Sequence, residues 1–556
     1  MPAALRAPSS GVLGSPGVRG LGGHPVSSGR AGPGSTGDPG GGVLGPSRLG
    51  EGAQLAGSRR LGIIVVIDGL RPDAITPQDT PVLHALGQDG AVATQGRAVA
   101  PAVTRVNAAS MATGELPTRT GITGNLLHVP EVAPAPFTTA DARNLLRLRE
   151  RTGSIVDTVT LAERIEHAGG RFVAVGSGSS GSTLCLNPRA PDGVGTLVNA
   201  DDPAKGAPFA WPPEVGDQVH ARFGPPPPKG RDHSNADSSD YATRIVTDYV
   251  LPMLDASVVM LWLTEPDSAQ HRHGVGSPAA TDALRRADRN VGQLVDQLER
   301  LGLRDEANLF VVSDHGFSQA ARTVDVAQDL VAAGCKEGPD STDLVVARTG
   351  CVGIFADSEE RVPSTVEWLR RQDWADLIFT ASHDAASPLG WVDGTFALEL
   401  LGSTHPTRSP DIHVTLAWNQ LAEPTGGWTG LYASTGGSTA SAPGGGDHGN
   451  LSPADVTTTF RAWGADIART RSEVPVGNVD LAPTVLALTG LPDEADGRHG
   501  RVAHELLTGE HERAEVTIDR RIHTTASADG AYAAELKTSL VAGHRYLDQG
   551  RRIRET

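Results

Sequence analysis

Three separate apolar runs of strand character end in acidic residues, and this pattern constrains the fold more than any other feature. The runs are LGIIVVIDG, VVMLWLTEPD and NLFVVSDHG, which end at Asp68, Asp267 and the pair Asp314–His315. Continuous β-branched runs are typical of strands that are buried on both faces of a parallel sheet. Because binding residues collect at the carboxyl ends of such strands, we expect these side chains to converge.

Helical patterns alternate with the strands. In the segment 277–302, Leu284, Val291, Leu294 and Leu298 recur at helical spacing and indicate a core-facing stripe. This alternation predicts an α/β fold with a central, mostly parallel sheet and helices on both faces. Further helices are expected at 80–90, 158–170, 238–254, 453–464 and 479–490.

Composition divides the 556-residue chain into three parts. Residues 1–58 are rich in Gly, Pro and Ser, cannot bury enough apolar surface to order themselves, and are predicted to form a disordered leader. Residues 59–510 are expected to form one large α/β domain, with a loop-like insertion at about 177–240 that covers the site. Residues 511–556 alternate like strands and are interpreted as an extension of the same domain.

The overall composition excludes several function classes. A net charge of -17 leaves no basic stripe for a nucleic-acid backbone, so specific nucleic-acid binding is not expected. Three cysteines are no disulfide framework, although a Cys335–Cys351 bridge is possible. No apolar run is long enough to span a bilayer, and no contiguous apolar signal segment is visible, which favours a cytoplasmic location by default. The oligomeric state is left open.

Seven residues at the strand ends and nearby turns are candidate metal ligands. They are Asp68, Thr104, Asp267, His271, Asp314, His315 and His448. Carboxylates and neutral imidazoles are good zinc ligands, although such sites also accept manganese or iron. Two divalent cations about 4 Å apart stabilise the attacking and leaving oxygens of a displacement at phosphorus. The set therefore predicts two divalent metal ions, with Zn²⁺ preferred.

Thr104 is the candidate nucleophile, because metal coordination activates an otherwise weak hydroxyl. A helix is expected to begin near Arg105, so that its free backbone N–H groups point at the transferred group. Asn107 is expected to donate its side-chain amide to a non-bridging oxygen. Arg105 either contacts substrate or lies on the solvent side of the helix start.

These motifs resemble the alkaline phosphatase superfamily, and within it the nucleotide pyrophosphatase/phosphodiesterase branch. The matching stretches are DGLRPD, TRVNAASMATG with LPTRTGITGN, LTEPDSAQHRHG, VVSDHGF and GGDHGN, in this order. The resemblance implies an alkaline-phosphatase-like catalytic domain with Thr104 as nucleophile and Asn107 as the phosphate-binding amide. It implies one zinc held by Asp267, His271 and His448. It implies a second held by Asp68, Thr104, Asp314 and His315.

The sequence departs from the family pattern beside the nucleophile. The family usually has an aromatic or small residue and then Pro before Asn, whereas this chain reads Thr104-Arg105-Val106-Asn107. The expected activity is hydrolysis of a small phosphorylated substrate, such as a nucleotide pyrophosphate or a phosphodiester, through a covalent phospho-threonine. The alternatives are a phosphomonoesterase or phosphonate hydrolase, and an inactive binding module that retains the fold. Secreted relatives are common in the resembled family.

Overall fold

The computed structural model describes residues 60–201, 206–228, 235–349, 351–384, 387–419, 429–434, 445–490, 499–509 and 516–553. Residues Ala56–Thr556 form one compact unit. The predicted leader at 1–58 lies outside the described residues. Within the described ranges, no helix has both the length and the apolar character that a bilayer crossing requires. Cys185, Cys335 and Cys351 are all free thiols, so the possible bridge is not formed.

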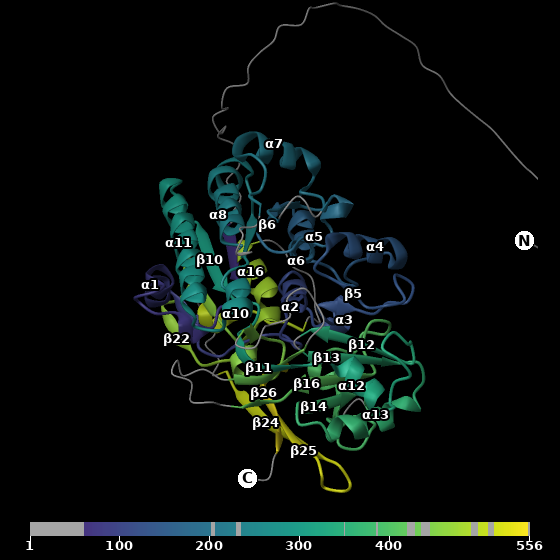
Figure 1. Cartoon of the computed structure of the whole chain (residues 1–556). Helices are drawn as coiled ribbons and strands as arrows, with labels where there is room; N and C mark the ends of the chain where they lie inside the picture. Colours follow the sequence, from purple (N-terminus) through teal and green to yellow (C-terminus); the bar gives the residue numbers. More distant parts are fainter. Residues whose placement is uncertain are drawn as a thin grey trace, which may run out of the picture. The chain divides into compact units, whose positions relative to one another are not determined.

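A nine-stranded sheet forms the centre of this unit (Figure 1). Its strands, in spatial order, are β22 (Thr470–Ser472), β2 (Ala91–Ala93), β21 (Phe460–Gly464), β10 (Ala307–Val312), β1 (Leu61–Ile67), β9 (Val258–Leu263), β6 (Phe172–Gly176), β7 (Thr196–Asn199) and β8 (Ala210–Trp211). The pairs from β10 through β1, β9 and β6 to β7 are all parallel, whereas β21 and β8 pair antiparallel with their neighbours. The predicted α/β class with a mostly parallel sheet is confirmed.

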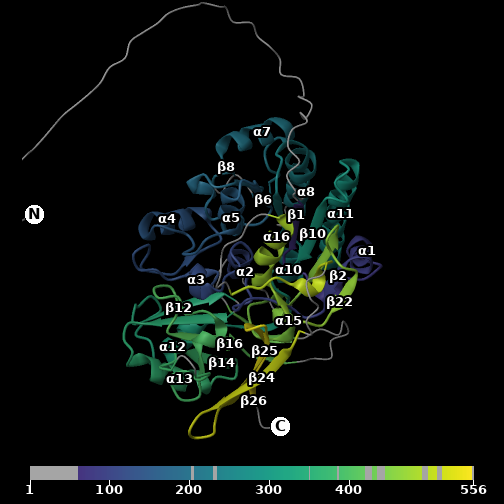
Figure 2. The ribbon, with the colours of Figure 1, turned by 180° about the vertical axis from the view of Figure 1, so that it is seen from behind.

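Alternate residues of β1 face two separate apolar cores, which explains why its sequence is apolar throughout. Ile63 and Val65 pack in one core with the predicted stripe on α11 (Pro278–Arg300), beside α8 (Ala236–Ile245). Ile64 and Val66 face the other core. On that side α16 (Leu481–Thr489) lies against β1, and Figure 2 shows it from behind. Helices therefore cover both faces of the sheet.

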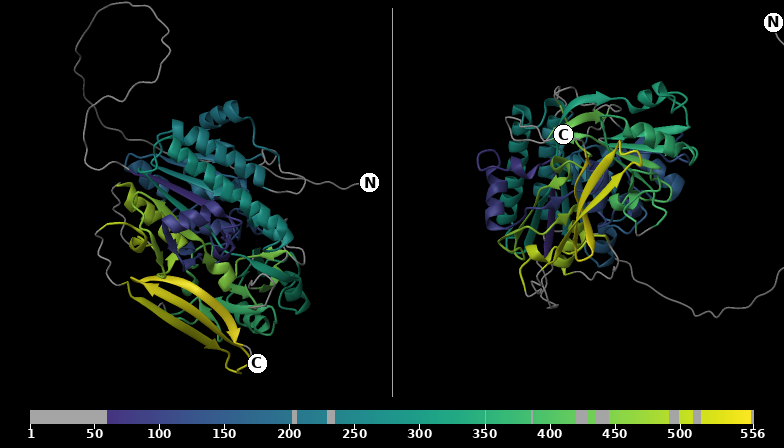
Figure 3. Two further views of the ribbon diagram at one scale, coloured as in Figure 1. Left: turned by 90° about the vertical axis from the view of Figure 1, so that its left-hand side faces the viewer. Right: turned by 90° about the horizontal axis from the view of Figure 1, so that it is seen from below.

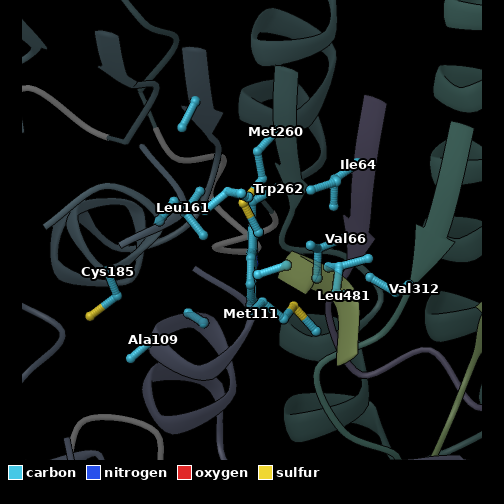
Figure 4. Close-up of a cluster of buried hydrophobic side chains, with 14 of the residues drawn as sticks. Ile64, Val66, Ala109, Met111, Leu161, Cys185, Met260, Trp262, Val312 and Leu481 are labelled. Carbon is cyan, nitrogen blue, oxygen red and sulfur yellow. The ribbon is translucent and has the colours of Figure 1, made fainter. Parts of the chain in front are cut away.

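The second core packs against the carboxyl ends of the central strands. Ile64, Val66 and Val312 from neighbouring strands meet Leu481 of α16 and Met111 of α2 (Thr104–Met111), as Figure 4 shows. All of these side chains are fully buried. Close packing of this kind fixes the strand ends, and with them the polar residues that follow.

Five smaller sheets accompany the central one in the described residues, and two of them form the region beside it. The first contains β12 (Leu344–Thr349), β13 (Cys351–Ala356), β16 (Ile412–Leu416), β14 (Ala375–Thr380) and β15 (Phe396–Ala397). The second is the antiparallel C-terminal sheet, visible in yellow in Figure 3, with β24 (Ile518–Ala526), β25 (Ala533–Val541) and β26 (His544–Ile553). β25 and β26 pack on β14, so the strand-rich C-terminus extends the flanking region.

Two local predictions differ from the structure. Residues 177–240 are not simply loop-like: they contribute α6 (Ser180–Leu186), β7, β8 and α7 (Pro213–Phe223), and the two strands extend the edge of the main sheet. The helix expected at 453–464 is only α15 (Pro453–Val456), followed by β20 (Thr457–Thr458) and β21. The β-branched run Thr457–Thr459 favours strand over helix there.

Candidate active site

The three central strands place their acidic residues at the same edge of the sheet. Asp68 directly follows β1, Asp314 and His315 follow β10, and Asp267 begins α10 (Asp267–His273) shortly after β9. Gly69 has a φ of 69°, a left-handed conformation that favours glycine, and its N–H donates to Asp314 Oδ1 at 3.0 Å. The predicted convergence of the strand ends is therefore present.

One group of candidate ligands surrounds His315. Its Nε2 lies 3.0 Å from Asp314 Oδ2, 3.5 Å from Asp68 Oδ1 and 3.4 Å from Thr104 Oγ1. Asp314 and His315 are fully buried, and Asp68 is 3% exposed. These four residues were predicted to share one cation, and the structure brings them together.

A second group surrounds Asp267. Its Oδ1 lies 3.4 Å from His271 Nε2, one helical turn away on α10, and 3.6 Å from His448 Nε2. His448 follows β19 (Gly446–Asp447), and β19 pairs with β11 (Ser318–Val324), which begins three residues after His315. The rings of His315 and His448 stack with centroids 3.5 Å apart, so the two groups adjoin.

All three histidines are oriented by backbone carbonyl groups. The Nδ1 atoms of His271, His315 and His448 lie 3.0, 2.9 and 2.9 Å from the carbonyl oxygens of Gly446, Gly316 and Ala102. A hydrogen bond from Nδ1–H fixes the tautomer in which Nε2 carries a lone pair. Each Nε2 therefore faces the carboxylates as a ligand atom.

The carboxylates leave buried oxygen atoms without a hydrogen-bond donor. These atoms are Asp68 Oδ1, Asp267 Oδ1 and Asp314 Oδ2. Ligand atoms of Asp68, Asp314 and His315 lie within 4.8 Å of one another, as do those of Asp267, His315 and His448. Buried charge without a partner is costly, and a bound cation removes this cost. The donor set therefore fits two divalent cations.

The pKa values of Asp68 and His448 agree with this geometry, whereas at His315 burial is outweighed by the charge of Asp314, which raises the pKa. Burial, followed by the nearby charges of Asp314 and Asp267, holds the pKa of Asp68 well above its usual value. Burial, followed by the charges of His315 and His271, holds the pKa of His448 well below its usual value, so the ring is neutral. A neutral imidazole is the form that binds a metal.

Thr104 is the first residue of α2 and is 5% exposed. Its Oγ1 faces His315 Nε2 at 3.4 Å. The N–H groups of the first helical turn have no partners within the helix. The N–H of the next residue, Arg105, donates to Asn125 Oδ1 at 3.1 Å. The helix start predicted at this position is confirmed.

Asn107 differs from the prediction that its amide binds substrate. Its side chain is fully buried, and its Nδ2 donates to the carbonyl oxygens of Val99 and Val103 at 3.1 Å each. Its Oδ1 accepts from the N–H of Val99 at 2.7 Å and from Asn478 Nδ2 at 2.9 Å. With every donor and acceptor used inside the protein, Asn107 fixes the loop before Thr104.

Three residues beside the site were not among the predicted site residues. Asn125 is held by the N–H of Arg105 through Oδ1, and among the described residues its Nδ2 has no acceptor. Asp447 offers a carboxylate oxygen within 4.8 Å of ligand atoms of His271 and His448. Trp262 donates from Nε1 to Asp68 Oδ2 at 3.1 Å. Asn125 and Asp447 both lie in quoted motifs, LPTRTGITGN and GGDHGN, which is the signal that could have identified them.

Comparisons with known proteins agree with the architecture. The model of the family described as Type I phosphodiesterase / nucleotide pyrophosphatase matches residues 62–424. Ectonucleotide pyrophosphatase/phosphodiesterase family member 7 of Mus musculus is 40% identical over 77 residues, which are 14% of this chain and 17% of that protein. Family member 1 of Mus musculus is 48% identical over 61 residues, 11% of this chain and 7% of that protein.

Solved structures show the same fold. Murine ectonucleotide pyrophosphatase / phosphodiesterase 5 matches with a TM-score of 0.56 and 16% identity, over 81% of this chain and 100% of that chain. An inactive variant of that protein in complex with AMP matches with a TM-score of 0.54 and 17% identity. The aligned segments span less than a fifth of the curated relatives named above. Because the family model covers more than half of the sequence, the chain belongs to the Type I phosphodiesterase / nucleotide pyrophosphatase family.

Proposed function

We propose that this chain is a metal-dependent hydrolase of phosphodiester or nucleotide pyrophosphate bonds, with Thr104 as its nucleophile. The observation that carries the proposal is the position of Thr104 Oγ1, 3.4 Å from His315 Nε2, beside two adjoining groups of ligand atoms. Family membership and the AMP complex of a related fold support a nucleotide or similar small substrate.

The same geometry suggests how the cations are divided. Asp68, Thr104, Asp314 and His315 would hold one, and Asp267, His271 and His448 the other, with zinc favoured by the ligand types. When bound, the cations supply Lewis acidity that favours the alkoxide of Thr104 and offsets charge on the phosphoryl oxygens. The backbone carbonyl groups that contact the histidines orient these metal ligands, and the surrounding packed side chains exclude water from the buried edge of the sheet.

The proposed reaction has two displacements at phosphorus. Thr104 Oγ forms a bond to phosphorus while the bond to the leaving group breaks, and the hydroxyl proton ends on the leaving-group oxygen. Water then attacks the phospho-threonine, leaves its hydroxyl on phosphorus and returns a proton to Thr104 Oγ. The N–H of Arg105 is taken by Asn125 Oδ1, so at the start of α2 the N–H of Thr104 would be the donor to a non-bridging oxygen.

Hydrolysis of bis(4-nitrophenyl) phosphate, with chelation and zinc add-back, tests the proposal. We expect activity that a chelator abolishes and zinc restores, with about two equivalents of metal bound. Acid-quenched protein should carry the nitrophenylphosphoryl group on the peptide that contains Thr104. A protein that binds metal but cleaves neither diesters nor nucleotides would instead be an inactive binding module.

A further inference from the structure

Arg105 stands beside the proposed nucleophile without a partner for its charge. It is the second residue of α2, and its side chain is partly buried. Its Nε is buried and has no hydrogen-bond acceptor. Over the described ranges, no carboxylate lies within ion-pair distance of its guanidinium, although its backbone N–H is held by Asn125.

Three other buried or nearly buried arginines in the described part of the chain have partners for their charge. Arg71 bonds to Asp73 and to the carbonyl oxygen of Phe317 at 3.0 Å. Arg501 bonds to both carboxylate oxygens of Glu505, at 2.9 and 2.6 Å. The Nε of Arg408 also lacks an acceptor, but its terminal nitrogens donate to the carbonyl oxygen of Ile155 at 2.9 Å and to Asp157 at 3.4 Å. Arg105 therefore departs from the pattern, since an unpaired buried guanidinium is costly unless a ligand pairs with it.

The position of Arg105 is set by the packing of α2. Arg105 directly follows Thr104 on this helix, and α6 packs against it. The residue thus adjoins the candidate nucleophile on a helix whose position the fold fixes.

We propose that Arg105 is a specificity-determining residue that binds the second anionic oxygen of an unesterified phosphoryl group, so that phosphomonoesters or phosphonates become substrates of the same site. The proposal rests on the function proposed above. A diester presents one negative charge at phosphorus, whereas a monoester or phosphonate presents up to two and needs a further cation. The planar fork of arginine donates two parallel hydrogen bonds to such a group.

The chemistry follows the same two displacements. With a monoester, the P–O bond to the alcohol breaks as the bond to Thr104 Oγ forms, the alcohol takes the proton, and water releases inorganic phosphate. With a phosphonate, the P–C bond breaks instead, and the carbon leaving group takes both the electron pair and the proton. Comparison of 4-nitrophenyl phosphate with phosphonoacetate distinguishes these two sources of the same charged group.

Arg105→Gln is the main test, with kcat/KM measured on 4-nitrophenyl phosphate, phosphonoacetate and bis(4-nitrophenyl) phosphate. We expect the monoester-to-diester or phosphonate-to-diester ratio to fall by about 10–100-fold, as for loss of a charge-assisted hydrogen bond. Arg105→Lys should recover part of the ratio. Arg119→Gln is the matched control, because Arg119 is 53% exposed and pairs with Glu115. Equal loss on all substrates, or unchanged ratios, would overturn the proposal.

A binding measurement tests Arg105 without turnover. In titration calorimetry of zinc-loaded protein, Arg105→Gln should weaken inorganic phosphate binding at least about tenfold, and weaken dimethyl phosphate binding much less. Equal weakening of both anions would overturn the role of Arg105. If Arg105→Gln selectively weakens phosphate binding but the wild-type protein cleaves no substrate, the anion site is supported and the proposed hydrolase function is contradicted.

Discussion

Two buried polar clusters of this chain differ in how their charges are satisfied. At the sheet edge, Asp68, Asp267 and Asp314 each keep a buried oxygen that no donor reaches. Near α16, Asp480 is also fully buried, yet its oxygens accept from the N–H groups of Gly477 and Arg501 and from the Tyr546 hydroxyl, at 2.7–2.8 Å. The first cluster needs something from outside the chain, and the second does not.

The difference distinguishes a cluster that binds a ligand from a cluster that stabilises the fold. A satisfied buried network stabilises the fold, whereas an unsatisfied one destabilises it until a ligand arrives. Arg501 strengthens the second cluster through Glu505 and Tyr546. The contrast therefore predicts that the metal-free protein gains stability when Asp68 is neutralised and loses stability when the Asp480 carboxylate is removed.

Removal of the nucleophile should have the largest effect. Thr104→Ala is expected to lower kcat/KM for a diester by about 10⁴-fold or more, because no other described hydroxyl contacts His315 Nε2. Thr104→Ser, which keeps Oγ, should retain measurable turnover. Metal content should change little in either variant. Substantial zinc-dependent turnover by Thr104→Ala would remove Thr104 from the proposed mechanism.

Neutralising Asp68 should lower activity and stabilise the metal-free protein. Asp68→Asn is expected to reduce kcat/KM by about 10³-fold through loss of a metal ligand. Because burial raises the pKa of Asp68 above 3.8 in the folded state, the ionised form destabilises the metal-free fold. Its contribution is most favourable below pH 3.8 and is lost as the pH rises through the folded pKa.

The measurement is thermal unfolding of chelated protein across pH. The Asp68→Asn variant should match the wild type near pH 4 and unfold at a higher temperature at pH 8. An Asp68→Asn variant that is less stable than the wild type at pH 8 without metal would mean that the cluster is satisfied by the protein alone.

Truncation of the carboxylate in the satisfied cluster should destabilise the fold. Asp480→Ala is expected to lower the free energy of unfolding by about 3 kcal/mol, because Tyr546 and Arg501 lose a buried acceptor. Urea unfolding measures the loss. Below the unfolding transition, kcat/KM should stay within about twofold of the wild type. A stability change under about 0.5 kcal/mol would erase the contrast between the clusters.

The smallest expected effect concerns the donor to Asp68. Trp262→Phe removes the indole N–H that bonds to Asp68 Oδ2 and should weaken zinc affinity by about 10–100-fold. Competition with a zinc chelator measures this. Trp463→Phe on β21 is the control, because Trp463 lies near Arg304 rather than a site carboxylate. Equal affinities for the two variants would make Trp262 a packing residue only.

Much of the site could be predicted because it follows from strand ends. Asp68, Asp267, Asp314 and His315 sit where apolar runs stop, and parallel pairing of β1 with β9 and β10 brings these ends together. His448 was found through its motif, although its position depends on the pairing of β19 with β11.

The errors arise where backbone partners decide the role of a side chain. The spacing of Asn107 from Thr104 suits a substrate contact, but nothing in the spacing indicates that Val99 folds back to occupy its amide. Asn125 is distant in sequence from Thr104, so its bond to Arg105 is a tertiary contact. Short strands such as β7 and β8 lie between Gly- and Pro-rich stretches that read as loop.

The stacked rings of His315 and His448 have a consequence for maturation. Asp68, Thr104, Asp314 and His315 all precede residue 316, whereas the neighbouring group needs His448, 133 residues later. A ribosome therefore delivers the two sets of ligands at different moments. The fold that positions both sets is finished only when β21 and α16, which follow His448, have joined the central sheet and its core.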